Sequence, residues 1–203
     1  MNIIVATSKN GIIGKNGTLP WYIPEDIKYF HDITKNNICV MGRKSFDSFE
    51  KYEPIFLQNR VIVVITSKLL KNKNNIYFTN INNVLKVLTE VQNNLNNKSK
   101  EIFILGGEKI YDYFIPISKY IYLTFIDKAY NGDRKFSSFK NYELIATSPM
   151  YFSKESNAKY QFQIYKYCNN GKIHVFSPNF SYFQEWIFTL LHFLHPLKIE
   201  KSI

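Results

Sequence analysis

Asp26 is the residue whose type and surroundings most suggest chemistry. Pro24 fits the first position of a helix, which puts Glu25 and Asp26 in the first helical turn. Acids are favoured there because the amino end of a helix is positive, and this is the simpler interpretation of both residues. Trp21 before Asp26 and Ile27 after it favour a second interpretation, in which Asp26 faces inward and desolvation raises its pKa. We therefore interpret Asp26 as a proton-handling group.

Three segments that follow apolar runs carry cations and hydroxyls suited to an anionic ligand. They are Gly42–Ser45, Thr66–Lys68 and Gly106–Lys109. A glycine before a helix leaves backbone N–H groups free at the positive end of the helix dipole, so two such ends facing each other suit a pyrophosphate. The simpler interpretation is two ordinary strand-to-helix turns, because neither glycine segment matches G-x-G-x-x-G or the P-loop pattern.

Short apolar runs alternate with segments of helical period along most of the chain. The expected strands are residues 2–8, 38–41, 61–65, 102–105 and 120–126, and the expected helices are 25–35, 43–50, 81–91 and 108–114. This alternation predicts an α/β fold with a largely parallel sheet, helices on its faces and ligands at the carboxyl ends of the strands. Residues 142–146 and 159–168 are expected to be strands without a helix between them, which predicts a closing antiparallel hairpin.

The composition describes a folded domain with a basic surface. Its 203 residues with 45% hydrophobic content are enough for one well-buried core. A formal charge of +10 favours anionic partners, but many lysines lie among asparagines in segments such as 71–75 and 93–98. We interpret these segments as solvated loops and predict no nucleic-acid surface. Two cysteines without a Cys-x-x-Cys pair predict reduced thiols, and an amino end without signal-peptide features predicts a cytoplasmic location.

In order and spacing, these segments resemble dihydrofolate reductase. The resemblance rests on Ile13-Gly14 through Leu19-Pro20-Trp21, Asp26 with Phe30 and Thr34, Met41 to Ser45, Arg60 before a buried strand, Gly106-Gly107 before Tyr111, and Tyr122-Leu123-Thr124 running to Asp127. It covers residues 1–168, the expected domain. It implies one three-layer domain with a central, mostly parallel, eight-stranded sheet closed by a C-terminal hairpin, and the reduction of 7,8-dihydrofolate to tetrahydrofolate by NADPH.

The resemblance gives Asp26 the role of the carboxylate that pairs with the N3 and 2-amino edge of the pterin. Thr124 would share that hydrogen-bond network, and Trp21 would hold a neighbouring water. The ring edge that Asp26 contacts is remote from N5, which receives the proton while C6 receives the hydride. Asp26 is therefore expected to tune the electrostatics of the ring, and a water passing Leu19 is expected to bring the proton.

The resemblance also implies a largely apolar substrate pocket. Its walls would be Ile4, Val5, Ala6, Ile27, Phe30, Phe49, Leu57, Leu105 and Tyr111, although core packing explains each apolar residue equally well. Arg60 would hold the α-carboxylate of the substrate's glutamate as a two-pronged pair. The sequence departs from the family here, because Leu57-Gln58-Asn59-Arg60 replaces the usual Leu-Pro-Gly-Arg after a longer connection at 50–56.

The residues that the resemblance assigns to NADPH come from five segments. They are Ala6; Ile13, Gly14, Asn16 and Gly17 in an expected mobile loop; Gly42, Arg43, Lys44, Ser45, Thr66, Ser67 and Lys68; and Leu105, Gly106, Gly107, Glu108, Lys109, Ile110 and Tyr111. Arg43, Ser67 and Lys109 map to contacts with the adenosine 2′-phosphate, which favours NADPH over NADH. In the family a cis peptide bond joins Gly106 to Gly107.

Residues 169–203 lie beyond the resemblance and form the expected C-terminal extension. Phe183, Ile187, Leu190, Leu191 and Leu194 share one helical face, which predicts an amphipathic helix too short to span a membrane. Three roles stay open: packing on the domain or on a second subunit of a homodimer, weak association with a membrane surface, or a disordered end. His192 and His195 have no third ligand nearby, so no metal site is predicted.

Two alternative functions fit part of the pattern. Reductases of riboflavin synthesis resemble this architecture and also use NADPH, but Asp26 and Arg60 argue against them. A folate-binding or scaffolding protein without turnover is the other, and nothing in the predicted core supports it. The expected partners are therefore dihydrofolate and antifolate inhibitors, with a monomer or a homodimer as the assembly.

Overall fold

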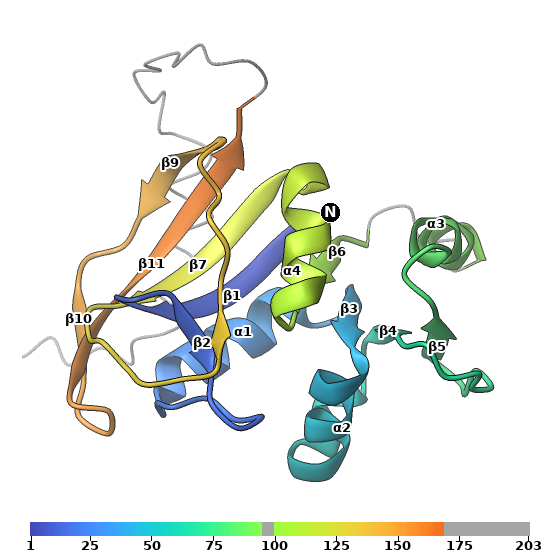
Figure 1. Cartoon of the computed structure of the whole chain (residues 1–203), viewed down its shortest axis with the longest axis horizontal. Helices are drawn as coiled ribbons and strands as arrows, with labels where there is room; N and C mark the ends of the chain where they lie inside the picture. The colour runs from blue at the N-terminus through green and yellow to red at the C-terminus, as the bar shows by residue number, and fades with distance from the viewer. Residues whose placement is uncertain (95–99, 169–203) are drawn as a thin grey trace, which may run out of the picture. The chain divides into compact units, whose positions relative to one another are not determined.

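One mixed β-sheet organises the computed structural model, which describes residues 1–94 and 100–168 (Figure 1). The strands are β1 (Asn2–Ser8), β3 (Ile38–Gly42), β4 (Val61–Ile65), β5 (Ile76–Thr79), β6 (Ile102–Ile104), β7 (Tyr120–Ile126), β9 (Tyr142–Thr147), β10 (Tyr151–Ser153) and β11 (Ala158–Tyr167). They follow the order β10-β11-β7-β1-β6-β3-β4-β5, and β9 also pairs with β11. All pairs are parallel except those that β11 makes with β7, β9 and β10.

The C-terminal strands close the sheet as an antiparallel unit. β10 pairs with β11 at residues 158–160, and β9 pairs with it at residues 163–167. Since β7 occupies the other edge of β11, β9 and β10 share one position at the end of the sheet. The prediction of a mostly parallel, eight-stranded sheet with an antiparallel C-terminal hairpin is confirmed.

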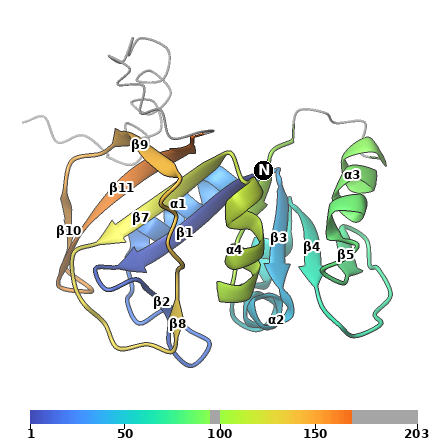
Figure 2. The same cartoon turned by 45° about the horizontal axis from the view of Figure 1, so that its top comes forward.

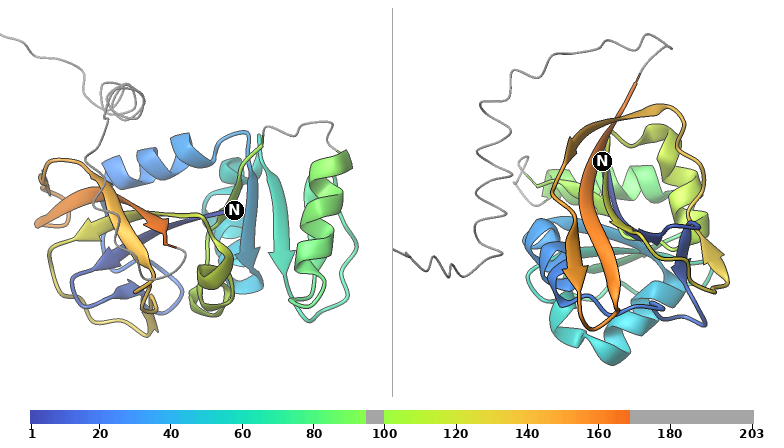
Figure 3. Two further views of the ribbon diagram at one scale, coloured as in Figure 1. Left: turned by 90° about the horizontal axis from the view of Figure 1, so that it is seen from above. Right: turned by 90° about the vertical axis from the view of Figure 1, so that its left-hand side faces the viewer.

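Helices cover both faces of this sheet. They are α1 (Pro24–Thr34), α2 (Arg43–Tyr52), α3 (Val84–Asn94) and α4 (Glu108–Phe114), with short 3-10 turns η1 (Pro54–Leu57) and η2 (Ile115–Ile117). In Figure 2, α4 crosses in front of the sheet while α1 lies behind it, and Figure 3 shows the same separation from above. Val84, Leu88 and Val91 of α3 join Phe114 of α4 in one apolar cluster with the strands. The predicted three layers are therefore present.

The central strands explain why their sequences are uninterrupted apolar runs. Residues 38–41 of β3 and all of β4 are buried. Strands covered by helices on both faces have no side that favours polar residues. In β11, by contrast, Tyr160, Phe162 and Ile164 are buried while Gln161 and Gln163 are partly exposed, so buried and partly exposed side chains alternate.

The sequence pattern does not predict four of the short strands or one helix start. β2 (Ile12–Gly14) and β8 (Arg134–Lys135) pair with each other away from the main sheet, and β5 and β10 lie at its edges. These four short strands lie outside the buried centre of the sheet, so their sequences carry too little apolar signal to be recognised. α3 begins at Val84 instead of residue 81, because the Asn80 side chain accepts a hydrogen bond from the Asn83 N–H (3.0 Å) and holds a turn there.

Within the two described ranges, no helix is both long enough and apolar enough to cross a membrane. The predicted amphipathic helix with Phe183, Ile187, Leu190, Leu191 and Leu194 lies outside the described residues, as does the rest of the expected extension.

Candidate active site

The glycine segments that follow β3 and β6 meet at one edge of the sheet. β6, β3 and β4 are parallel neighbours, so their carboxyl ends lie together. The Gly42 N–H donates to the carbonyl of Gly106 at 2.7 Å, which joins the two segments directly. The bond between Gly106 and Gly107 is cis, as the resemblance implied. The third segment, Thr66–Lys68, follows β4 immediately alongside.

Asp26 faces inward from the first turn of α1. It is 8% exposed, and its carboxylate forms a hydrogen bond with the hydroxyl of Thr124 in β7. Thr124 is itself 2% exposed and lies beside Ala6 of β1. Burial raises the pKa of Asp26 to about 6, and the hydrogen bond with Thr124 opposes that rise. At neutral pH the site therefore holds a poorly solvated anion beside Thr124.

The apolar residues of α1 do not all lie on its buried face. The structure buries Asp26, Tyr29 and Ile33, whereas Ile27 and Phe30 are partly exposed. Tyr29 packs on Phe162 of β11, with ring centroids 4.3 Å apart. Because this packing sets the rotation of the helix, Asp26 points into the sheet and Ile27 and Phe30 lie beside it.

The loop before α1 is held by hydrogen bonds at two places. The Asn16 N–H donates to the Asp133 carboxylate at 3.0 Å, and the Tyr22 N–H donates to Ser156 Oγ at 2.8 Å. Trp21 is 7% exposed, whereas Leu19 is 50% exposed and so is the least enclosed of the four catalytic candidates.

Three phenylalanine rings form a stack that joins α1, α2 and η1. Phe49 and Phe56 lie 4.3 Å apart between ring centroids, and Phe30 lies 5.1 Å from Phe56. Phe30 and Phe49 are pocket candidates, whereas Phe56 was not predicted because the longer connection obscures its position. Of the remaining pocket candidates, Ile4, Val5, Leu105 and Tyr111 are buried and Ala6, Ile27 and Leu57 are partly exposed. The Tyr111 hydroxyl donates to the Ile4 carbonyl at 2.9 Å.

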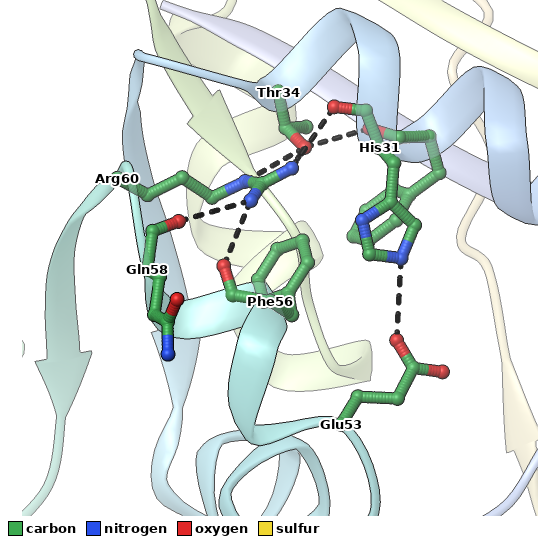
Figure 4. A network of polar contacts seen from close by, with 7 residues as sticks. His31, Thr34, Glu53, Phe56, Gln58 and Arg60 are labelled. Carbon is green, nitrogen blue, oxygen red and sulfur yellow. Dashed lines mark hydrogen bonds and ion pairs between the residues drawn. The ribbon is translucent and has the colours of Figure 1, made fainter.

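Arg60 is a buried cation surrounded by neutral oxygens of its own chain (Figure 4). Its guanidinium donates to the carbonyls of Phe56 (2.8 Å), His31 (2.9 Å) and Gln58 (3.3 Å), and to the Thr34 hydroxyl at 3.1 and 3.2 Å. It also lies over the Phe56 ring, 4.1 Å from the centroid. Burial lowers the pKa of Arg60, and no acid of the described residues forms an ion pair with it.

The turn that leads to Arg60 has different residues from the family pattern. Asn59 has a φ of 59°, a left-handed conformation suited to the glycine usual at this place. The Asn75 amide donates to the carbonyls of Leu57 (3.0 Å) and Arg60. We predicted a solvated loop for residues 71–75, which is wrong for Asn75, since it holds this turn in place.

The helix ends beside the glycines leave room and donors for a ligand. Neither α2 nor α4 has a side-chain cap at its amino end, where Gly42 and Gly107 stand. A Cβ atom on Gly107 would have the hydroxyl of Ser45 as its nearest neighbour, at 3.9 Å. A Cβ atom on Gly106 would instead lie 2.6 Å from the Tyr111 ring. Space is therefore open at Gly107 and filled at Gly106.

The charged candidates around this edge differ in how firmly they are held. Arg43 pairs with Asp47 at 2.6 Å and lies over the Phe78 ring. The remaining cofactor candidates are arranged as follows: Lys44, Ser67, Lys68, Lys109, Asn16 and Gly17 are exposed, Ile13, Thr66, Glu108 and Ile110 are partly exposed, and Gly14 is buried. No three His, Cys, Asp or Glu side chains within 1–94 and 100–168 come together as a metal site.

Comparison with known proteins gives one consistent result. The model of the dihydrofolate reductase family matches residues 1–169. The dihydrofolate reductase of Enterococcus faecium is 31% identical over 160 residues, covering 78% of this chain and 91% of that protein. The enzyme of Buchnera aphidicola (subspecies Acyrthosiphon pisum) is 33% identical, covering 82% and 94%. Among solved structures, dihydrofolate reductase from Enterococcus faecalis, complexed with NADP(H) and RAB-propyl, is similar with a TM-score of 0.69, 26% identity and coverage of 83% and 96%.

Proposed function

The chain belongs to the dihydrofolate reductase family, and on this premise we propose that its buried Asp26 orients the pterin ring of the substrate for reduction. The protein reduces 7,8-dihydrofolate to tetrahydrofolate and uses NADPH as the reductant. The observation that carries the assignment of Asp26 is its burial next to Thr124, away from any ion pair of the described chain.

Asp26 acts as an anion that lacks solvation. Burial raises its pKa to about 6, so it is ionised at neutral pH, and within the described part of the chain its hydrogen-bond partner is Thr124. A carboxylate in this state gains most from a ligand that brings several N–H donors to it. The N3 and 2-amino edge of a pterin presents such donors in one plane. Asp26 and Thr124 therefore fix the ring and set the charge along its edge.

Trp21 and Leu19 complete the proposed catalytic set. Trp21 is buried and forms an edge-to-face pair with Tyr130 at 5.3 Å, which fixes its indole ring beside α1. The exposed Leu19 covers the pterin ring of the substrate from the solvent side and controls how water reaches that ring. Neither residue titrates, so their role is to shape access and position rather than to carry a proton.

Arg60 and the phenylalanine stack hold the rest of the substrate. Phe30, Phe49 and the partly exposed Leu57 offer apolar surface to the aromatic middle of dihydrofolate. Arg60 lacks an acidic partner in the described chain, and a carboxylate of the substrate supplies one. Since its N–H groups already bond to neutral oxygens, the carboxylate shares these donors with the protein carbonyls.

The edge of the sheet where Gly42 and Gly106-Gly107 meet fits NADPH. The uncapped amino end of α2 and the hydroxyl of Ser45 provide hydrogen-bond donors for a pyrophosphate, and the space at Gly107 gives it room. Arg43, Ser67 and Lys109 provide contacts for the 2′-phosphate. Ala6, Ile13 and Gly14 bind the nicotinamide side, under the loop that Asn16 and Tyr22 tie down. When bound there, NADPH supplies the hydride.

Antifolate inhibitors are the second class of ligand that we propose. A heterocycle with amino donors on one edge competes with dihydrofolate for Asp26, because both satisfy the same carboxylate. The cytoplasmic location and a monomeric or homodimeric assembly stay predictions from the sequence.

The test is NADPH consumption with and without dihydrofolate, measured by nicotinamide absorbance. We expect NADPH to be consumed only when dihydrofolate is present, and we expect a strong preference for NADPH over NADH. The Asp26→Asn variant should lose most turnover at neutral pH. Asp32→Asn is the matched control, since Asp32 lies on the same helix but is exposed and pairs with Lys28 at 2.6 Å. Full activity of Asp26→Asn would remove Asp26 from the mechanism. Binding of dihydrofolate without NADPH consumption would identify a binding protein instead of a reductase.

A further inference from the structure

Asp26 and Tyr29 leave α1 on the same side of the helix. Residues three positions apart share one helical face, and the two side chains are both buried. The ring of Tyr29 packs on Phe162 of β11, with 4.3 Å between the ring centroids. Asp26 accepts a hydrogen bond from the hydroxyl of Thr124 in β7. The first turns of α1 are therefore attached to the sheet at two places.

The two places of attachment are neighbours in the sheet. Phe162 and Thr124 are direct partners in the antiparallel pairing of β11 with β7. Side chains of directly opposite residues in such a pair lie side by side on one face. The hydrogen bond of Asp26 and the ring contact of Tyr29 thus reach adjacent positions of the same sheet face. A change in the ring contact therefore displaces the carboxylate from its hydrogen-bond partner.

The sheet side of this attachment is held firmly. The Phe162 N–H donates to the Ser148 hydroxyl at 3.0 Å, and the Phe162 carbonyl accepts from the Ser148 N–H at 2.8 Å. The Phe162 ring also lies near the rings of Tyr160 and Tyr151, at 5.7 and 6.2 Å between centroids. Since these contacts fix the strand, the helix is the part that moves when the Tyr29 ring is removed.

The titratable groups close enough to sense Asp26 bring it no opposite charge. They are the phenols of Tyr29 on α1, Tyr111 on α4 and Tyr160 on β11. Burial raises the pKa of each phenol, and the negative charge of Asp26 is among the further causes, so all three stay neutral at neutral pH. Glu25, the other acid of this turn, also raises the pKa of Tyr160. The solvation of Asp26 therefore depends on how deeply α1 holds it.

We propose that Tyr29 is a positioning residue for the reduction, which acts through Phe162 to hold Asp26 beside Thr124 at the depth where it meets the pterin. The role belongs to the aromatic ring and not to the hydroxyl, because the contact that fixes α1 is made between rings. This inference rests on the proposed function, since it concerns how the carboxylate that orients the pterin is held.

The experiment follows the ionisation of Asp26 itself and compares it with catalysis. The carboxyl carbon of Asp26 is observed by NMR in protein labelled with carbon-13 aspartate, and the Asp26→Asn variant identifies its signal. Tyr29→Leu should lower the pKa of Asp26 by about one unit, because burial raises this pKa more than the hydrogen bond with Thr124 lowers it. The same variant should lower kcat/KM for dihydrofolate about tenfold and leave the KM for NADPH within about twofold.

Three further variants separate positioning from a general loss of stability. Tyr29→Phe keeps the ring and should keep the wild-type pKa and kcat/KM. Phe162→Leu should act like Tyr29→Leu, and combining the two should add little, because both remove one contact. Tyr165→Leu is the matched control, since Tyr165 also lies on β11 but packs on Phe139 at 5.0 Å, in the apolar cluster that α3 and α4 share. It should lower stability without changing either quantity.

The inference is overturned if Tyr29→Leu lowers stability but leaves the Asp26 pKa and kcat/KM at their wild-type values. It is also overturned if Tyr29→Phe loses as much as Tyr29→Leu. Tyr29→Met keeps most of the side-chain volume without the ring, and it replaces Tyr29→Leu if that variant does not fold. Full activity of Asp26→Asn is a failure of the proposed function. An unchanged Asp26 pKa in Tyr29→Leu, with an inactive Asp26→Asn, is a failure of this inference alone.

Discussion

Asp26→Asn is expected to stabilise the protein at neutral pH while it removes activity. The carboxylate is buried in a place that disfavours its charge, and the function proposed here needs that charge. An asparagine keeps the shape and can still accept a hydrogen bond from Thr124, but it carries no charge at any pH. The substitution therefore removes a cost to folding that the wild-type chain carries at the pH where it works.

The size of this effect follows from the pKa of Asp26. Burial raises it from 3.8 to about 6, a difference of roughly two units that corresponds to about 3 kcal/mol. Between these values the native state holds a proton that the unfolded chain has released, so the free energy of unfolding falls as pH rises. The contribution of the protonated Asp26 to the free energy of unfolding is complete below pH 3.8 and is lost above about pH 6. Asparagine does not titrate, so the Asp26→Asn variant does not lose this free energy as pH rises.

The assay is urea unfolding of both proteins at intervals from about pH 4 to about pH 7. The difference between the two free energies isolates Asp26, because all other groups are shared. We expect the variant to gain on the wild type by up to about 3 kcal/mol as pH rises through this range. Thr124→Val should move the wild-type transition to higher pH, since it removes the hydrogen bond that lowers the pKa. A difference that is flat with pH, or that grows as pH falls, would refute the reasoning.

Three other substitutions test the surroundings of the site. Gly107→Ala should leave the thermal midpoint nearly unchanged but weaken NADPH binding about tenfold or more in a titration. The added methyl group would make no close contact with the protein and would lie where the ligand is proposed to bind. Equal affinity of the variant and the wild type would contradict this. Gly132→Ala should lower both the midpoint and kcat, since its Cβ atom would lie 2.5 Å from the Gly14 carbonyl and displace β2; wild-type values would show that the loop position is unimportant. Asn75→Asp removes the donors to the turn at Arg60, so it should cost about 1–3 kcal/mol in urea unfolding and raise the KM for dihydrofolate without raising that for NADPH; a rise in both would indicate general loosening.

The parts of the fold that the sequence predicts are those whose residues share one environment over several positions. β4 is buried at every position, and its five-residue apolar run is visible without any partner. α2 and α4 both begin directly after a glycine, as predicted from Gly42 and Gly107. β5 has no such signal because it is an edge strand with mostly half-buried residues after a polar stretch.

The parts of the site that the sequence does not predict depend on contacts across the chain. Asn75 bonds to carbonyls 15 and 18 residues away, and within an asparagine-rich stretch nothing distinguishes it from its solvated neighbours. The inward direction of Asp26 is one of two interpretations of the sequence, and the sequence alone does not decide between them. Its place in the first turn follows from Pro24, but its burial depends on how Tyr29 packs against Phe162.

Asp26 and Arg60 together explain why α1 is central to the site. Both are buried, and neither forms an ion pair with any acid or base in residues 1–94 and 100–168. Burying a charge without a counter-ion is unfavourable, so neutral residues at both places would make a more stable protein. One charge lies in the first turn of the helix. The other is bonded to His31 and Thr34 in its last turns, five and eight residues further along, which is about 8 to 12 Å at 1.5 Å per residue. In the function proposed above, the hydrogen-bond donors at one end of the ligand stabilise the Asp26 anion and the carboxylate at its other end pairs with Arg60. The rigid helix between the two residues would then select for the length of the ligand.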